Sequence, residues 1–172
     1  AWWCNTFGGA EIINLDGFQV ASFVPQPTLK GLEINEKFID FRSAADSLKA
    51  GIEFDSVPPF ENYPDGVKLH HRQNTLTFHF SAIDWTAPNK IRYSYHLKGL
   101  NQNWSLPGSD TKAEFRSLPY GQYTFEVKAY GEYQQWSPSF TYPFRIRPPW
   151  WYSWWAYVVY SLLGGTIFYS AY

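Results

Sequence analysis

The chain has 172 residues, a formal net charge of −1, and 14 Lys and Arg against 15 Asp and Glu. Its cations form no run or stripe, which argues against nucleic-acid binding, because neutralising phosphates requires clustered Lys and Arg. The single cysteine, Cys4, excludes an internal disulfide and a zinc cluster built on cysteines. Aromatic residues make up 21% of the chain, which suits a β-sheet core, a membrane interface or a sugar-binding surface.

The first 24 residues carry Trp, Gly and short apolar runs. Trp2 and Trp3 precede Gly8-Gly9, and Ile12-Ile13 comes after it, which predicts two short strands joined by a glycine turn. Such a hairpin is marginal alone, so we expect it either to pack on the next part of the chain or to belong to a larger β structure upstream. Because the sequence has no Met and begins Ala-Trp-Trp, we interpret it as a fragment of a longer chain.

Residues 25–66 predict one hairpin and a long irregular segment. Two short apolar runs flank the turn pair Asn35-Glu36 and contain Leu29, Leu32, Ile34, Phe38, Ile39 and Phe41. Between 42 and 66, Pro58-Pro59 and Pro64 interrupt regular structure. In this segment we predict only a short helix at 43–50 and a strand at 52–57.

After Val67 apolar and polar residues alternate with a period of two, which is typical of half-buried strands. The apolar positions are Leu76, Phe78, Phe80 and Ala82; Tyr93, Tyr95 and Leu97; Ala113 and Phe115; Tyr123, Phe125, Val127 and Ala129; and Phe140, Tyr142, Phe144 and Ile146. Turn residues separate these runs, so the spacing predicts an all-β sandwich of short antiparallel strands. Pro143 cannot donate to a ladder, which places the last strand at an edge or facing solvent at that point.

A tight turn feeds the fourth of these runs. Pro119 fixes a negative φ and Gly121 tolerates a positive one. The stretch Leu118-Pro119-Tyr120-Gly121-Gln122-Tyr123 has the form of a tyrosine corner, in which a Tyr hydroxyl bonds to backbone a few residues upstream in immunoglobulin-like sandwiches. We predict this role for Tyr123; the alternative is an ordinary core Tyr on a hairpin strand.

The last stretch has no charged residue from Pro148 to Tyr172. A helix from Tyr152 onward would run about 31 Å, which is close to the thickness of a bilayer core. An aromatic cluster at its start suits the membrane–water interface and consists of Trp150, Trp151, Trp154 and Trp155. We therefore predict a transmembrane helix here. The alternative is a buried core helix or an exposed apolar patch, which a sandwich of this size has little room to cover.

Residues from about 67 to 155 resemble the three-Y domain, an immunoglobulin-like or fibronectin III-like β-sandwich of bacterial hybrid two-component regulators. The matching stretches are Asn74 to Asp84, Tyr95 to Leu100, Trp104, Phe115 to Tyr123, and Pro148 to Trp151. The motif core positions in this chain are Phe78, Phe80, Tyr95, Leu97, Trp104 and Phe115, with Phe115 standing where a Tyr is expected. Phe7-Gly8-Gly9 resembles the close of the last blade of a preceding β-propeller.

This resemblance implies three parts: a remnant of the last propeller blade at 1–24, the three-Y sandwich at 25–147, and the interfacial cluster with the transmembrane helix at 148–172. It implies a signal relay whose propeller and sandwich lie in the periplasm, often for sensing polysaccharide breakdown products. One helix then crosses the cytoplasmic membrane to a histidine kinase or DNA-binding output, although no such motif occurs in these residues.

The favoured hypothesis from the sequence is a transmitting module. Pro148-Pro149 stiffens the exit from the last strand, and a stiff joint passes on a movement that a Gly/Ser linker would absorb. Signalling also needs two arrangements that a ligand favours differently, and we expect a homodimer to provide them. Membrane lipid is the other expected partner.

A carbohydrate-binding module is the alternative function. Exposed aromatic rings can stack on sugars, and the candidates near predicted loops are Trp104, Trp136, Tyr130 and Tyr133. Each of these rings can equally serve core or turn packing.

Catalysis is not expected from this segment, and the sequence suggests no cofactor or metal. A glycosidase needs two facing carboxylates, and Asp84, Asp110 and Glu114 show no such pairing, with Asp84 predicted to cap the turn before Ala87-Pro88. The four histidines, His70, His71, His79 and His96, lack metal-ligand spacing. His79 and His96 fall on the polar rows of their strands, so we predict that they are solvated.

Overall fold

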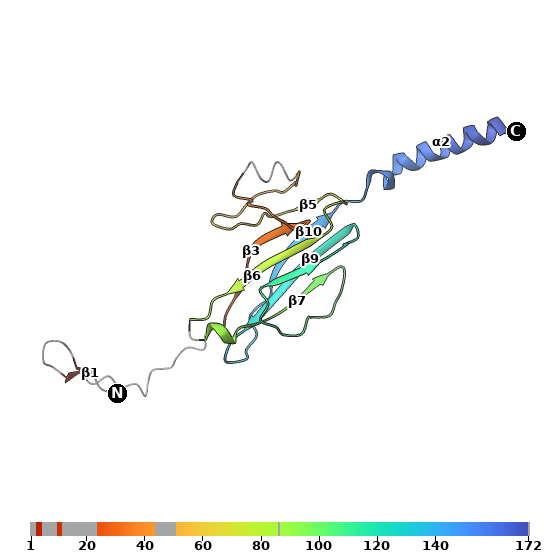
Figure 1. Ribbon diagram of the computed structural model, residues 1–172. Coiled ribbons are helices and arrows are strands. Elements are labelled where there is room, and N and C mark those ends of the chain that lie inside the picture. Colours follow the sequence, from red (N-terminus) through yellow and green to blue (C-terminus); the bar gives the residue numbers. More distant parts are fainter. Residues whose placement is uncertain (1–2, 5–9, 12–23, 44–50, 86, 172) are drawn as a thin grey trace.

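A computed structural model describes residues 3–4, 10–11, 24–43, 51–85 and 87–171 (Figure 1). In these residues two sheets pack face to face and a single α-helix follows at the C-terminal end. The strands are β1 (Trp3–Cys4), β2 (Ala10–Glu11), β3 (Pro27–Ile34), β4 (Lys37–Phe38), β5 (Lys68–Leu69), β6 (Leu76–Ala82), β7 (Arg92–Lys98), β8 (Lys112–Phe115), β9 (Gly121–Tyr130) and β10 (Phe140–Ile146). The helical segments are the 3₁₀ turns η1 (Pro88–Lys90) and η2 (Trp150–Tyr152) and the helix α2 (Trp154–Ala171).

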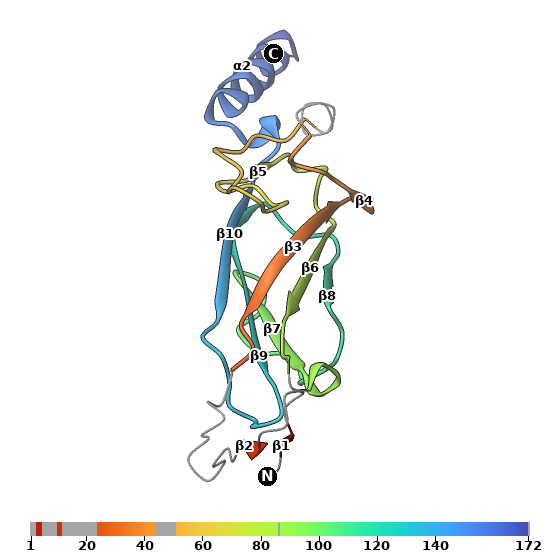
Figure 2. The same ribbon diagram turned by 90° about the vertical axis from the view of Figure 1, so that its left-hand side faces the viewer.

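The sheets have the strand orders β4-β3-β6-β8 and β5-β10-β9-β7. Figure 2 shows β3, β6 and β8 in one layer and β10 and β9 in the other. All pairings within these two sheets are antiparallel except that of β5 with β10. The trios β3-β6-β8 and β10-β9-β7 correspond to the A-B-E and G-F-C strands of an immunoglobulin-type sandwich. The predicted β-sandwich is therefore confirmed.

The core lies between these sheets and consists mainly of the alternating apolar residues after Val67. Phe78 of β6 and Phe125 of β9 stack across the sandwich with their ring centroids 4.3 Å apart and their planes 3° apart. Both side chains are fully buried. Most other ring contacts of the cluster, such as those of Phe78 with Tyr142, Phe80 with Tyr93 and Phe115 with Phe125, are edge-on, an arrangement that aromatic quadrupoles favour.

The predicted hairpin around Asn35-Glu36 is present, with Glu33 opposite Phe38 and Ile34 opposite Lys37. Asn35 and Glu36 have φ values of 51° and 63°, the left-handed pair that a two-residue hairpin turn requires. The Asn35 side chain donates to the Arg72 carbonyl at 2.9 Å, so this turn is also tied to the loop before β6.

Several predictions for the N-terminal half differ from the structure or lie outside it. β1 and β2 pair antiparallel, but most of the predicted propeller remnant at 1–24 and of the predicted helix at 43–50 lies outside the described residues. No strand forms at 52–57. Single bridges join Glu53 to Lys68 and Ser56 to Asp65 instead, and Gly66 between them has a φ of 66°, which is not a strand conformation.

The C-terminal segment is helical, but the α-helix begins later than predicted. η2 ends at Tyr152, and α2 starts at Trp154 with 18 residues, a length of about 27 Å. Among the described residues, no helix combines the length and the apolar character needed to cross a membrane.

The turn before β9 has the hydrogen bond expected of a tyrosine corner. The Tyr123 hydroxyl donates to the carbonyl of Pro119, four residues upstream, at 2.8 Å. The Tyr123 ring stacks on Phe144 of β10 at 5.4 Å, and burial raises the pKa of its phenol, which keeps it a donor. The corner therefore fixes the start of β9 against β10, the strand that leads to α2.

We expect Tyr123→Phe to lower the free energy of unfolding by about 1 kcal/mol, because the ring packing stays while the hydrogen bond to Pro119 is lost. Tyr133→Phe is the matched control, since Tyr133 is exposed. Urea unfolding monitored by circular dichroism measures both variants. Equal stabilities of the two variants would show that the corner bond contributes nothing.

Candidate functional site on the outer sheet face and at the joint to the helix

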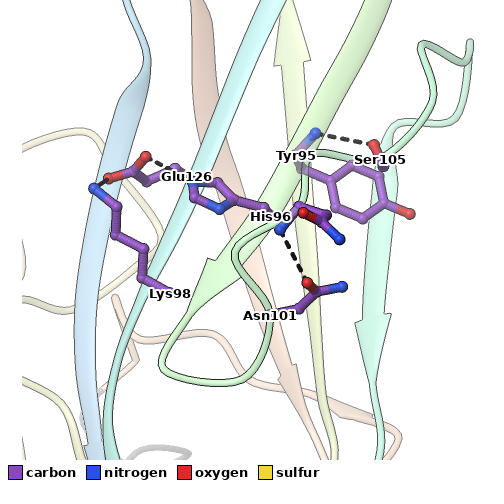
Figure 3. Close-up of polar contacts among 7 residues, drawn as sticks. Tyr95, His96, Lys98, Asn101, Ser105 and Glu126 are labelled. Atoms are coloured by element: carbon purple, nitrogen blue, oxygen red, sulfur yellow. Dashed lines mark hydrogen bonds and ion pairs between the residues drawn. The ribbon is translucent and has the colours of Figure 1, made fainter.

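A buried ionic cluster lies on the outer face of the β7–β9 pair. The register places His96 directly opposite Glu126, and His96 Nε2 lies 2.8 Å from one carboxylate oxygen of Glu126. The Lys98 ammonium donates to the other oxygen at 2.5 Å (Figure 3). His96 and Glu126 are 6% and 7% exposed, so the prediction that His96 is solvated is wrong.

The two partners of Glu126 keep its carboxylate ionised. Burial alone raises the pKa of Glu126, but the hydrogen bonds and charges of Lys98 and His96 outweigh it and hold the pKa below the ordinary value of 4.5. Lys98 keeps its ammonium largely in water. Glu126 is thus an ionised carboxylate inside the protein surface, which is tolerated because both oxygens have partners.

Trp104 covers His96, with the two rings tilted by 33° and their centroids 4.1 Å apart. The loop that carries Trp104 leaves β7 at Gly99, whose φ is 100° and whose Cβ position would lie 2.6 Å from the Gln122 carbonyl oxygen. A side chain does not fit there. The loop then returns along β7, where Ser105 exchanges hydrogen bonds with the Tyr95 backbone.

Trp136 repeats this arrangement at the edge of β9. Ser137 donates its N–H to the Ala129 carbonyl, and its hydroxyl accepts the Ala129 N–H, as Ser105 does with Tyr95. Two Trp-Ser pairs therefore extend the sheet, and each brings an indole over its outer face. The Lys128 ammonium lies 4.1 Å from the Trp104 ring centroid and 4.5 Å from that of Trp136, a cation–π arrangement.

The other predicted ligand contacts are placed around these indoles. Tyr130 meets Trp136 edge-on at 4.6 Å, and Tyr133 is exposed in the loop before it. A shallow pocket of about 430 Å³ beside the cluster is lined by His96, Lys98, Gly99 and Gln102. The structure thus brings Trp104 and Trp136 together around Lys128, with Tyr130 against Trp136, and it does not add Tyr133 to this group.

The joint between the sandwich and α2 is a second cluster. Arg147 donates its N–H to the Leu69 carbonyl at 2.9 Å, and its guanidinium pairs with Glu53. Two rings of η2 contact the body of the sandwich: Trp151 meets His71 at 5.2 Å, and Tyr152 meets Tyr120 at 5.5 Å. The joint is therefore held by contacts of Arg147, before the two prolines, and by contacts of Trp151 and Tyr152, after them.

Short-range hydrogen bonds join the η2 turn to the start of the helix. Tyr152 donates to the Pro149 carbonyl, and Ser153 donates to that of Trp150, each at 3.0 Å. Trp150 stacks on Trp155 with their planes 14° apart. The four predicted interfacial indoles, Trp150, Trp151, Trp154 and Trp155, are all exposed. Ala156, 1% exposed, is buried beneath this turn.

The motif core positions divide between the interior and the surface. Phe78, Phe80 and Leu97 are fully buried, whereas Tyr95 and Phe115 are half-buried and meet edge-on at 6.3 Å. Trp104 lies outside the core. The corner residue Leu118 is buried, and Pro119 is exposed.

The carboxylates considered for catalysis are not assembled into a site. Asp84 is buried and accepts the Ala87 N–H at 3.3 Å, as predicted for a turn cap. Glu114 pairs with Arg116 on β8, opposite Thr77 at the far end of β6 from Asp84, and Asp110 is exposed. Within the described part of the chain, no group of three or more His, Cys, Asp or Glu is arranged to hold a metal ion.

A family model described as the Y_Y_Y domain matches residues 85–147, from the turn before β7 to the residue after β10. Residues 85–147 are therefore similar to a Y_Y_Y domain. The match covers the corner, both Trp-Ser pairs and the His96–Glu126 cluster. The sandwich extends beyond it, since β3 and β6 precede the matched residues.

The proteins similar to this chain include a histidine kinase and extracellular domains of putative one-component and hybrid two-component systems. Histidine kinase P4 of Formosa agariphila is 27% identical over 149 residues, which are 86% of this chain and 11% of that protein. Two solved structures from B. thetaiotaomicron are also similar. The extracellular domain of the putative one-component system BT4673 is 26% identical, with a TM-score of 0.56 over 73% of this chain. The extracellular domain of the putative hybrid two-component system BT3049 is 25% identical, with a TM-score of 0.53 over 78% of this chain. The chain spans 16% of each.

We expect Glu126→Gln to destabilise the fold by about 1–3 kcal/mol at pH 7, because two charge-assisted hydrogen bonds are weakened. A carboxylate with a lowered pKa stabilises the fold above its ordinary pKa of about 4.5, and this contribution is lost as the pH falls through the lowered value. The variant and the wild type should therefore converge below that pH in urea unfolding.

The exposed ion pair supplies the control for this experiment. Glu114→Gln should change stability by less than about 1 kcal/mol, because Glu114 and Arg116 are both solvated. A stability difference for Glu126→Gln that stays constant down to about pH 3 would contradict the role assigned to its charge.

Proposed function

We propose that this chain is the extracytoplasmic relay segment of a membrane-bound sensor of the two-component type. In this proposal a propeller domain upstream binds the signal, the sandwich responds as a rigid body, and α2 carries the movement toward a cytoplasmic kinase or DNA-binding output. Support comes from the Y_Y_Y match and from the similarity to sensor proteins. The similar extracellular domains favour a periplasmic location of the sandwich at the cytoplasmic membrane.

The observation that carries the proposal is the joint. β10 pairs with β9 over its whole length, and the Arg147 N–H bonds to the Leu69 carbonyl. The turn at 149–153 is hydrogen-bonded within itself, and the rings of His71 and Tyr120 contact η2 from the side. Pro148-Pro149 removes two backbone freedoms between them. A connection of this kind transmits rotation or translation, whereas a flexible linker dissipates it.

We further propose that α2 is embedded in lipid. Its sequence carries no charge, and several of its apolar side chains are exposed, with Leu162 and Leu163 more than half exposed. Such a surface requires an apolar partner. The exposed indoles at its start suit the headgroup layer, so we divide the chain into a blade remnant (1–24), the sandwich (25–147) and a membrane segment (148–172).

A homodimer would give the relay its two states, because a ligand shifts only an equilibrium between arrangements that it binds differently. Movement of one sandwich relative to its partner would then displace the two helices. The carbohydrate-binding alternative has less support, because the rings of Trp104 and Trp136 are engaged by Lys128 and, for Trp104, by His96.

Insertion of Gly-Ser-Gly-Ser after Arg147 in the full-length protein should abolish the response while leaving the protein abundant in the membrane. The physical reason is that the insertion separates β10 from the contacts of η2. The response is measured as output in cells exposed to a mixture of polysaccharide hydrolysates that activates the wild type.

The same insertion between Ser109 and Asp110, which are exposed and precede β8, is the control and should preserve the response. A full response from the protein with the insertion after Arg147 would disprove transmission through a stiff joint.

A further inference from the structure

The joint contains two adjacent histidines, one of which contacts η2. The rings of His70 and His71 lie with their centroids 4.0 Å apart, and the His71 ring meets the Trp151 ring at 5.2 Å with the planes 77° apart. His71 is therefore the side chain of the loop before β6 that touches the Trp cluster leading into α2.

The surroundings of His71 favour its neutral form. Its Nδ1 is buried and has no hydrogen-bond partner among the residues that the structure describes. Burial, then the neighbouring His70 and Arg72, lower the pKa of His71 below its ordinary value of 6.5. The Nδ1 of His70 accepts the Arg72 N–H. This bond closes the loop so that His70 and Arg72 both lie near His71.

The charged groups on the other elements of the joint do not raise the pKa of His71 again. Arg147, which follows β10, is itself a cation, and it engages the carboxylate of Glu53 through both of its terminal nitrogens. η2 contributes only Trp and Tyr, and Tyr152 faces Tyr120. A proton added to His71 would therefore create a partly buried cation close to Arg72, with no carboxylate among the groups that shift its pKa.

We propose that the contact between His71 and Trp151 is a proton-sensitive latch, closed at neutral pH and released on acidification, that sets how firmly the sandwich is joined to α2. This inference rests on the proposed relay function for its biological use. Its physical basis, the two histidines against the indole, is independent of which signal the protein senses.

The direction of the pH effect is set by the lowered pKa. A histidine that is harder to protonate in the closed joint stabilises that joint fully above its ordinary pKa of about 6.5. This stabilisation is lost as the pH falls through the lowered value. The ratio of closed to open joint then drops by as much as about tenfold for each unit by which the pKa of His71 differs between the two states.

Hydrogen–deuterium exchange of the full-length protein in nanodiscs tests the latch. Protection is measured at pH 8.0 and pH 5.5 for peptides covering 149–156, each corrected for the chemical exchange rate of the unfolded peptide at the same pH. We expect the protection of this segment to fall severalfold at pH 5.5. The β9 peptide, Gly121–Tyr130, should keep its protection.

Variants assign the effect to His71. In His71→Phe, which keeps a ring against Trp151 but cannot be protonated, protection should be equal at both pH values. His70→Asn should reduce the fall, because part of the lowered pKa of His71 comes from His70. His79→Phe, whose native ring pairs with Glu33 on the other sheet, should behave as the wild type.

The outcomes separate the latch from the relay. A segment 149–156 that is protected equally at both pH values in the wild type, or that loses protection equally in His71→Phe, overturns the latch and leaves the relay intact. A segment that is already unprotected at pH 8.0 overturns the stiff joint itself. Loss of protection in the β9 peptide of His71→Phe would mark misfolding, in which case His70→Asn decides.

Discussion

The stacked rings of Phe78 and Phe125 are the contact on which the structure depends. They lie 4.3 Å apart across the interior and join the central strand of each sheet, since β6 lies between β3 and β8 and β9 lies between β10 and β7. Because β9 is fixed from the inside by Phe125 and at its start by the Tyr123 corner, β10 has a firm neighbour along its whole length. The orientation of the chain's exit at Arg147 is thereby set by the core.

The outer face of the same strands adds to this rigidity in a different way. Glu126 is next to Phe125 in sequence and points to the opposite side of the sheet, where Lys98 and His96 hold its carboxylate. Trp104 and Trp136 approach from both edges and share the Lys128 ammonium. β9 is consequently covered on both faces, with an aromatic core inside and a layer of indoles and ion pairs outside, so bending this strand would disturb both layers.

The sequence was sufficient to predict the strands after Val67, because local alternation and turn residues determine them. It was also sufficient for the Asn35-Glu36 turn and for the hydrogen bond of Tyr123, which joins residues only four apart. It was misleading at His96. Alternation shows correctly that His96 lies on the outer face of the sheet, but its exposure to water depends on Trp104, which returns from a loop to cover it.

The contacts of the joint could not be predicted from local patterns. His71 and Trp151 are far apart in sequence and meet only because β5 aligns with the end of β10. The late start of α2 has a local cause that the apolar composition hides, namely the 3₁₀ turn that Pro149 begins. One available signal went unused: the repeated Trp-Ser pair at 104–105 and 136–137 marks the two places where indoles fold over the sheet.

The central claim is that the sandwich and α2 move as one body, and a distance measurement between them tests it most directly. Spin labels are attached at Lys112→Cys on β8 and Leu163→Cys on α2, both exposed positions, with Cys4 replaced by Ser in the full-length protein in nanodiscs at pH 8. Pulsed electron paramagnetic resonance should give a single narrow distance distribution, as wide as that between two labels within the sandwich. A broad distribution, with the helix sampling many orientations, would contradict the account.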